Sequence, residues 1–403
     1  MLLKTEIAQA ALSQQQQLLS QETYPRKMLD KIKILPNFAL VVSGIRRSGK
    51  STLLTQLIEK QGENSYFFLN FDTPKLFNFE FSDFALLDEI IAENPQIQTL
   101  YFDEIQVVEG WEVYVRGKLD QGYHVVVTGS NASLLSRELG TKLTGRHISK
   151  ELFPFSFVEF CEFLNKEKNA EAVAEYLNLG GFPQYLQLNE DEILNALIND
   201  ILYRDIIVRF GIRDERSMKR LLLFLAGNVG NLITAGKLKQ SLEVKSTATV
   251  QEYLSHLEQA YIIHLLPKFS YSYKVQLANP RKAYFIDNGL QRVISPSFSQ
   301  DLGRKLENAV FWELRGQYSE LFYYNENNKE CDFVVCKNSS PVQLIQVCWQ
   351  LNAENIARER DGLLDAINFF GLEKGIIITL DQEDKIIVDE KTIEIVPFWK
   401  MFG

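Results

Sequence analysis

The chain has 403 residues, of which 46% are apolar and 24% charged, and its net charge is −9. This length allows two to four domains, and the ordinary composition excludes a disordered or fibrous chain. The acidic total also excludes a protein that is basic over its whole surface. The charge is spread unevenly, because residues 203–282 carry 13 lysines and arginines against 6 acidic residues, whereas residues 296–403 carry 11 against 18. A basic middle segment therefore lies within an acidic chain.

The sequence contains no run of 18 or more apolar residues, so we expect no membrane span. Its first residues lack the basic region, apolar core and cleavage site of a secretory signal. The four cysteines are scattered and mostly flanked by apolar residues, which is typical of reduced, buried thiols, and the four histidines form no cluster. The sequence therefore predicts a cytoplasmic protein with no membrane partner and no structural metal.

Residues 1–36 are rich in glutamine and have few apolar anchors. We expect a helix there that packs on the following domain or on a neighbouring subunit. Residues 37–165 begin with an apolar run at 38–43, which is typical of a buried parallel strand. The chain is therefore predicted to start with a helical segment (1–36) that leads into an α/β domain (37–165).

The most informative segment reads Gly-Ile-Arg-Arg-Ser-Gly-Lys-Ser over residues 44–51, which matches the phosphate-binding pattern G-x-x-x-x-G-K-S. The two glycines allow successive backbone N–H groups to point at one oxyanion, and the following helix adds its positive N-terminal end. Lys50 is expected to reach the β- and γ-phosphates, and Ser51 is expected to bind Mg²⁺. We predict that ATP is bound by the loop and the start of its helix, namely Gly44, Ile45, Arg46, Arg47, Ser48, Gly49, Lys50, Ser51 and Thr52.

A second apolar strand, at residues 99–102, ends in the two carboxylates Asp103 and Glu104. At the carboxyl end of a parallel strand, Asp103 would hold Mg²⁺ together with Ser51, directly or through water. Glu104 would polarise the attacking water. The pair therefore predicts the catalytic half of an ATPase site.

A third apolar strand, at residues 124–128, is followed by Ser130 and Asn131. Either side chain could sense the γ-phosphate and orient water. The same residues, with Ser133, also suit the N-terminus of a helix, and the two interpretations are compatible.

Arg146 follows this region, where ring-forming ATPases place an arginine that reaches the neighbouring subunit's nucleotide. Such an arginine stabilises charge that develops on the transferring phosphoryl group. The alternatives are a surface arginine or an ion pair within the chain, and Arg137 is the second candidate for the trans role. The sequence does not decide between them.

Residues 166–216 are predicted to form a helical lid that is interrupted at Gly180-Gly181-Phe182-Pro183, a hinge or a helix start. Residues 217–295 show a winged-helix pattern, with helices at 218–227, 234–242 and 247–261 and a hairpin formed by 262–266 and 282–286. In such folds the last helix enters the DNA major groove. The candidate DNA contacts are Lys237, Lys239, Lys245, Thr247, Thr249, Gln251, Lys268 and Lys274. Because winged helices also bind proteins, a protein-interaction role stays open.

Residues 296–403 are predicted to form a mixed α/β domain with part of a metal-dependent nuclease centre. Glu307 on a helix and Asp332 on a strand fit the two carboxylates that hold Mg²⁺ in such a centre. The expected Glu-x-Lys on the next strand reads Gln346-Val347-Cys348 instead. Glutamine is a poor Mg²⁺ ligand and cysteine carries no cation, so we expect a nuclease-like fold with little or no nuclease activity.

Together these motifs resemble those of bacterial and archaeal AAA+-like P-loop ATPases with a C-terminal domain of uncertain function. The resemblance covers nearly the whole chain and rests on residues 44–52, 103–106, 128–131, 145–146, 154–157, 180–183, 203–206 and 307–308. It implies ATP hydrolysis, oligomerisation, and a winged helix followed by a restriction-endonuclease-like tail. The predicted fold class is α/β: a P-loop NTPase parallel sheet with a helical lid, a winged-helix domain and a nuclease-like α/β domain.

Two functions from different classes remain open. In the first, a homo-oligomeric ring, such as a hexamer, couples hydrolysis of Mg²⁺-ATP to remodelling of DNA or translocation on it, as a helicase-like enzyme acting on branched DNA does. In the second, the chain is a nucleotide-dependent switch or scaffold that binds protein partners. The basic segment favours the first function, and the acidic tail suits the second.

Overall fold

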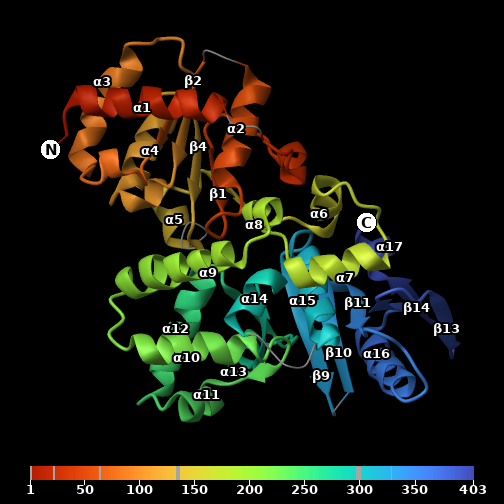
Figure 1. The fold of residues 1–403 in the computed structure, drawn as a ribbon. Coiled ribbons are helices and arrows are strands. Elements are labelled where there is room, and N and C mark those ends of the chain that lie inside the picture. Colours follow the sequence, from red (N-terminus) through yellow and green to blue (C-terminus); the bar gives the residue numbers. More distant parts are fainter. Residues whose placement is uncertain (1, 21–22, 63–64, 133–136, 296–300, 328) are drawn as a thin grey trace. The chain divides into compact units, whose positions relative to one another are not determined.

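The computed structural model describes residues 2–20, 23–62, 65–132, 137–295, 301–327 and 329–403. The chain divides into two compact units, Met1–Leu152 and Phe153–Gly403, called here the first and second units (Figure 1). In the described parts of the chain, no helix combines the length and apolar character needed to cross a bilayer.

The first unit is built on a five-stranded, fully parallel sheet. Its strand order is β2-β3-β4-β1-β5, so β4 lies between β1 and β3. The strands are β1 (Ala39–Ser43), β2 (Tyr66–Asn70), β3 (Thr99–Asp103), β4 (His124–Gly129) and β5 (His147–Glu151). The helices are α1 (Lys4–Leu19), α2 (Lys50–Gln61), α3 (Phe84–Ala92), α4 (Trp111–Asp120) and α5 (Arg137–Lys142). The carboxyl ends of all five strands meet at one edge, where polar side chains can converge.

Alternate residues of these strands enter two separate hydrophobic cores. Val41, Leu100 and Val127 pack with α1, α3 and α4 on one face of the sheet. Leu40 and Tyr101, one residue out of step, pack with α2 on the other. Because side chains of a strand alternate between faces, a strand buried on both sides must be apolar throughout. This explains the continuous apolar runs in the sequence and produces three layers, helix, sheet and helix.

The N-terminal helix packs on the first unit, one of the two placements expected for residues 1–36. Ile7, Ala10 and Ala11 of α1 are buried in the core beside the sheet. Gln14 forms two hydrogen bonds with the backbone of Asn70, donating to its carbonyl at 3.0 Å and accepting from its N–H at 2.8 Å. Asn70 ends the edge strand β2, so this helix covers the edge of the sheet.

The second unit begins with five helical segments, the last four of which lie where the lid was predicted, at residues 166–216. They are α6 (Phe157–Phe163), α7 (Ala170–Leu179), α8 (Pro183–Leu188), α9 (Asp191–Asp200) and a π-helix (Ile201–Val208). The unit starts at Phe153, so residues 153–165 belong with these helices, whereas the predicted boundary lay after residue 165. Side-chain packing explains the difference, because Phe157 and Phe160 are fully buried against Tyr176 of α7.

The Gly180-Gly181 break is a tightly packed turn that leads into α8. A Cβ on Gly181 would lie 2.3 Å from the carbonyl oxygen of Phe155, so only glycine fits there. The buried carboxylate of Asp287 accepts hydrogen bonds from Gly181 N at 2.6 Å and from Leu290 N at 2.9 Å. Burial raises the pKa of Asp287 to about 6. Of the two roles expected for this break, the structure shows the helix start.

Three helices and three short strands follow in the order α10, β6, α11, α12, β7, β8. Their bounds are α10 (Glu215–Ala226), β6 (Leu232–Ile233), α11 (Ala235–Leu242), α12 (Thr247–Gln259), β7 (Ile263–Pro267) and β8 (Arg281–Phe285). The antiparallel sheet has the order β6-β8-β7, so β8 is paired on both sides. A short helix, α13 (Tyr273–Ala278), lies between β7 and β8, and α14 (Asn288–Ile294) follows. These bounds agree with the predicted helices and hairpin to within three residues.

The C-terminal part of the second unit is a six-stranded mixed sheet of order β13-β14-β12-β11-β10-β9. Its strands are β9 (Glu320–Glu326), β10 (Lys329–Lys337), β11 (Ser340–Val347), β12 (Lys374–Thr379), β13 (Asp384–Val388) and β14 (Lys391–Pro397). Its helices are α15 (Leu302–Arg315), α16 (Ile356–Phe370) and α17 (Phe398–Phe402). Leu363 and Ile367 of α16 pack on Leu344 and Ile377 of the sheet. The predicted α/β character of this region is confirmed.

A buried glutamate should make the second unit less stable as the pH rises. Glu313 accepts a hydrogen bond from Phe157 N at 2.6 Å, and burial raises its pKa to about 7. The ordinary value is 4.5, so the folded state binds this proton more tightly, and the stability it contributes is lost as the pH rises from about 4.5 through 7. Glu313→Gln should reduce the fall in the free energy of unfolding between pH 5 and 8 by on the order of 2 kcal/mol.

Scanning calorimetry at several pH values checks this expectation. Glu373→Gln, at an exposed position, is the control and should leave the pH dependence as in the parent chain. An unchanged slope in Glu313→Gln would show that this carboxyl group does not titrate in the expected range.

Candidate nucleotide-binding site

The P-loop connects β1 to α2 in a conformation that depends on its two glycines. Gly44 has φ 157° and Gly49 has φ 94°, and a Cβ on Gly44 would lie 2.1 Å from the carbonyl oxygen of Leu152. Arg47, between them, also has a positive φ of 63°. Helix α2 begins at Lys50, directly after Gly49, so its unpaired N–H groups and positive end face the loop. The local structure is therefore suited to holding phosphate oxygens.

The Lys50 ammonium lies buried above this loop. Its Nζ donates to the carbonyl oxygens of Gly44 and Ile45, both at 3.1 Å, and lies 3.4 Å from Glu104 Oε1. Only 4% of this side chain is exposed. A buried ammonium is stable only with such partners, so the loop carbonyls and Glu104 hold the charge at the phosphate-binding loop.

Asp103 lies at the carboxyl end of β3, beside the hydroxyl group of Ser51. Ser51 Oγ donates to Asp103 Oδ2 at 2.7 Å, Asn70 Nδ2 donates to the same oxygen at 2.8 Å, and Thr128 donates to Oδ1. Burial and the adjacent Glu104 raise the pKa of Asp103, and the hydroxyl groups of Thr128 and Ser51 oppose that rise. A hydroxyl and a carboxylate oxygen in contact form a donor set that suits Mg²⁺, so the residues present fit the ion that accompanies ATP.

Glu104 occupies a backbone conformation that is unusual for glutamate. Its φ is 52° and its ψ is 38°, which costs roughly 1 kcal/mol or more. The hydroxyl of Thr128 accepts from its N–H at 3.1 Å, and Gln106 Nε2 donates to its Oε2 at 2.6 Å. Burial acts to raise the pKa of Glu104, but the Lys50 ammonium and Gln106 outweigh it and hold that pKa below its ordinary value. The carboxylate is therefore ionised at neutral pH, as a group that accepts a proton must be.

The two sensor candidates lie at the same edge of the sheet, where β4 ends. Ser130 is 5% exposed and hydrogen-bonds through its side chain to Glu104, and Asn131 is 1% exposed. The structure thus brings Ser130 to the residue proposed to activate water. Ser133 lies outside the described residues, and so does the side chain of Arg137, so the helix-start alternative and the second finger candidate stay predictions.

Arg146 lies at the amino ends of the strands, opposite the end of the sheet that carries the P-loop. It directly precedes β5, and its carbonyl accepts from Ala39 N at the start of β1. Its guanidinium donates to Asp120 Oδ1 at 2.8 Å and to Thr144 Oγ1 at 3.3 Å. Within one chain, Arg146 is therefore an ion-paired surface residue remote from the P-loop. Its role toward a neighbouring subunit stays a prediction.

Three residues of this site were not predicted to belong to it: Arg26 and Asn70 carried no recognisable signal, and Thr128, although part of the motif at 128–131, had no assigned role. Arg26, which is 4% exposed, donates through Nη1 to the carbonyl of Ser48 at 2.5 Å and so braces the P-loop from the N-terminal segment. Asn70 and Thr128 hold Asp103 from the strands on either side of β3. Because the strand order is not evident from the sequence, their meeting could not be foreseen.

The residues proposed to contact DNA all lie in the second unit, and most are accessible. Thr249 is half-buried beside Ser246, and Lys268 is ion-paired with Glu326 at 2.8 Å. The exposed ones are Lys237, Lys239, Lys245, Thr247, Gln251 and Lys274. Their exposure permits the proposed contacts, which stay predictions.

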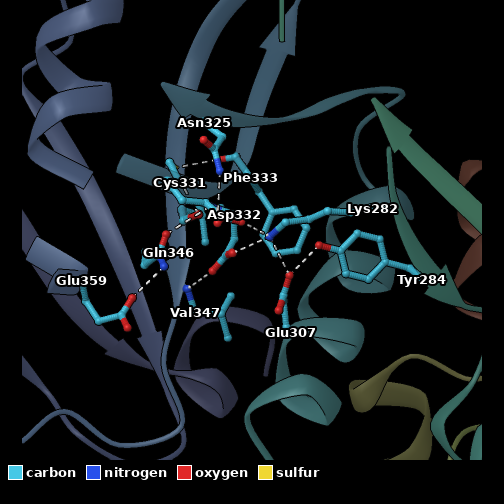
Figure 2. A network of polar contacts seen from close by, with 12 residues as sticks. Lys282, Tyr284, Glu307, Asn325, Cys331, Asp332, Phe333, Gln346, Val347 and Glu359 are labelled. Atoms are coloured by element: carbon cyan, nitrogen blue, oxygen red, sulfur yellow. Dashed lines mark hydrogen bonds and ion pairs between the residues drawn. The ribbon is translucent and has the colours of Figure 1, made fainter. Parts of the chain in front are cut away.

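A second group of charged side chains surrounds Lys282 of β8 (Figure 2). The structure brings Glu307 and Asp332 together, as the nuclease pattern predicted, with Lys282 Nζ 3.1 Å from Glu307 Oε1 and 2.8 Å from Asp332 Oδ1. The third partner, Glu330, is 2.6 Å away. Lys282 was not predicted, because nothing in an apolar strand marks its one lysine as buried and paired. Glu330 could have been found, since it lies two residues before Asp332 on β10 and shares its face.

Gln346 and Cys348 do not join this group as ligands. Gln346 accepts from Asp332 N at 3.1 Å and donates to Glu359 Oε2 at 2.7 Å, and Cys348 Sγ donates to the carbonyl of Gln350. A pocket of about 840 Å³ opens beside the group, lined among others by Gly230, Lys237, Lys282, Glu330 and Arg358.

Comparison with known proteins agrees with the architecture of the first unit. Residues 36–161 match the family described as an AAA domain, and residues 170–301 match a domain of unknown function (DUF8612). The chain is 36% identical over 399 residues to the "Uncharacterized protein MJ1544" of Methanocaldococcus jannaschii, covering 92% of this chain and 89% of that protein. It is 32% identical over 404 residues to an "Uncharacterized protein" of Haemophilus influenzae, covering 95% and 98%.

Among solved structures, the chain is similar to the Walker-type ATPase PABY2304 of Pyrococcus abyssi. The sequence identity is 16% and the TM-score 0.45, with 69% of this chain and 99% of that chain covered.

The parallel sheet, the P-loop and the Asp103-Glu104 pair define a P-loop ATPase fold of the AAA type. The chain belongs to the same family as the M. jannaschii and H. influenzae proteins, with which it is collinear over nearly its full length.

Removal of the Lys50 ammonium should weaken nucleotide binding. A hydrogen bond to a charged group contributes about 1.5–3 kcal/mol, so Lys50→Ala should raise the Kd for ATP by at least about tenfold. Titration with a fluorescent ATP analogue measures this change. Lys60→Ala, an exposed lysine on the same helix, should bind as the parent chain does, and equal affinity of Lys50→Ala would contradict the assignment.

Proposed function

We propose that this chain is an ATP hydrolase that couples Mg²⁺-ATP turnover to remodelling of DNA or translocation on it, as a homo-oligomer. The observation that supports hydrolysis most directly is the arrangement of Lys50, Glu104 and Asp103 at one edge of the sheet. Lys50 and Glu104 are ion-paired at 3.4 Å, and Ser51 and Asp103 are hydrogen-bonded at 2.7 Å. This arrangement supports the proposal, because a phosphate-binding lysine, two Mg²⁺ ligands and a water-activating carboxylate would all lie within reach of one P-loop.

In this proposal the P-loop N–H groups and Lys50 bind the β- and γ-phosphates. Ser51 and Asp103 would hold Mg²⁺, which supplies positive charge to the phosphate oxygens when bound. The shift of Lys50 toward phosphate would release Glu104 from its ion pair. Glu104 then accepts a proton from the attacking water, while Ser130, hydrogen-bonded to Glu104, helps to orient that water.

Glu104→Gln tests the assignment of the water-activating residue. The amide keeps the size of the side chain and one accepting oxygen, but it cannot accept a proton, so ATP binding should persist while catalysis fails. Turnover should fall by at least about a hundredfold, in line with general-base contributions. The measurement is phosphate release at saturating ATP, with the exposed Glu109→Gln as the matched control. Normal turnover in Glu104→Gln would remove this residue from the mechanism.

The DNA part of the proposal rests on the exposed lysines of α11 and of the turn before α12, together with exposed polar residues of α12. The order α10, β6, α11, α12, β7, β8, with β6 paired to β8, supports a winged-helix interpretation of residues 215–285. Thr247 and Gln251 are exposed on α12, and Lys237, Lys239 and Lys245 are exposed beside it. This arrangement matches a helix that reads a groove while nearby lysines contact phosphates.

Salt-dependent DNA binding tests this part. The triple variant Lys237→Ala/Lys239→Ala/Lys245→Ala should bind DNA more weakly and lower the salt slope by about one unit for each lost phosphate contact. Fluorescence anisotropy at several salt concentrations measures both. The control removes three exposed lysines of the first unit, Lys33, Lys60 and Lys75.

The proposal predicts in addition that ATP turnover is stimulated by single-stranded, duplex or four-way-junction DNA.

A nucleotide-dependent switch or scaffold is the second candidate, favoured by exposed apolar side chains near α13. Tyr271, Tyr273, Val275 and Leu277 are 47–78% exposed, and α13 has no buried residue. Such a patch is suited to contact with a protein partner. ATP turnover indifferent to every DNA form, with no salt-dependent binding, would favour this function over the first.

A further inference from the structure

Lys282 meets the requirements of an ammonium ion and leaves none of its three protons unused. Its Nζ has three carboxylate oxygens at 2.6, 2.8 and 3.1 Å, from Glu330, Asp332 and Glu307, and an ammonium group has three N–H donors. These are the distances of charge-assisted hydrogen bonds. The side chain is 4% exposed, so the charge depends on these partners rather than on water.

The surrounding structure holds this ammonium in place. Strand β8 is paired on both sides, with Lys282 opposite Leu232 of β6 and Leu266 of β7, so its backbone cannot shift by itself. Tyr284, two residues along the same face of β8, donates to Glu307 Oε1 at 2.6 Å. Figure 2 shows Lys282 and Tyr284 converging on Glu307 from one strand. The lysine therefore links the three-stranded sheet to α15 and β10.

With Lys282 in place, the carboxylate oxygens are spaced for an ammonium and not for a metal ion. Mg²⁺ requires oxygens at about 2.0–2.1 Å in near-octahedral array. Asp332 Oδ2 already accepts from Val347 N at 2.9 Å, and the amide oxygen of Gln346 accepts from Asp332 N. Glu307 Oε2 is packed close to Gly230, where a Cβ would lie 2.9 Å from it. Among the residues that the structure describes, no three acidic, histidine or cysteine side chains are placed to hold a metal.

We propose that the Lys282 ammonium is a built-in cation that takes the place of a divalent metal ion among Glu307, Glu330 and Asp332. The native chain then holds no divalent ion at this position, and loss of the lysine uncovers a site for one. The charge supports this, because removal of the ammonium makes the cluster of three carboxyl groups more negative by one charge beside an open pocket. Such a cluster attracts a divalent cation that prefers oxygen ligands.

The test measures Mn²⁺ binding to the nucleotide-free full-length chain by the loss of the free-ion EPR signal. Lys282→Met should bind one more Mn²⁺ per chain than the parent, and the added Asp332→Asn change should remove that ion. The comparison within this pair cancels any Mn²⁺ bound at the P-loop, which both variants share. Lys268→Met, which breaks the surface pair with Glu326, is the matched lysine control and should gain no ion.

Two results would overturn the proposal. One is a Mn²⁺ ion that binds the parent chain and is lost in the single variant Asp332→Asn. That result would show a metal-dependent centre in the presence of Lys282. The other is a folded Lys282→Met that gains no ion. If circular dichroism shows that Lys282→Met is unfolded, Lys282→Met/Glu330→Gln replaces it. That variant loses one positive and one negative group and retains Glu307 and Asp332, so it should still gain the ion, and failure to do so when folded counts against the proposal.

Discussion

A lysine ammonium buried among oxygen atoms organises each of the two units. In the first unit Lys50 is held by the carbonyls of the P-loop and by Glu104. In the second unit Lys282 is held by three carboxylates. Removing a charge from water is costly, so each ammonium forces the elements that carry its partners to meet. The same requirement thus shapes the nucleotide site in the first unit and, in the second, joins the three-stranded sheet to α15 and β10.

The two lysines differ in how easily a ligand can replace their partners. Lys50 contacts two neutral carbonyls and one carboxylate. The oxygens of a bound phosphate carry more negative charge, so they can take the place of these partners. Lys282 is held by three charged groups, and β8 is fixed by pairing on both sides. One ammonium is therefore exchangeable and suited to a reaction, whereas the other is suited to a permanent structural link.

The strand order explains how the nucleotide site is assembled. Because β4 lies between β1 and β3, Thr128 reaches both Asp103 and the N–H of Glu104. This bond holds Glu104 in its left-handed conformation, which turns its carboxylate toward Lys50. The strain of that backbone is offset by the hydrogen bonds and the ion pair that it makes possible. A single residue on a central strand thereby positions both carboxylates.

The sequence by itself determined the elements whose signals are local. The P-loop, the Asp103-Glu104 strand end and the helices and hairpin of residues 215–285 follow from glycine spacing and apolar periodicity, which act between near neighbours. Tertiary structure alone decided the contacts between distant side chains that no motif pairs. Arg26 at the P-loop, Thr128 at Asp103 and Lys282 among the carboxylates are brought in by strand order and packing. The reason is that a buried charge is stabilised by partners from any part of the chain, and a linear sequence does not state which strands lie side by side.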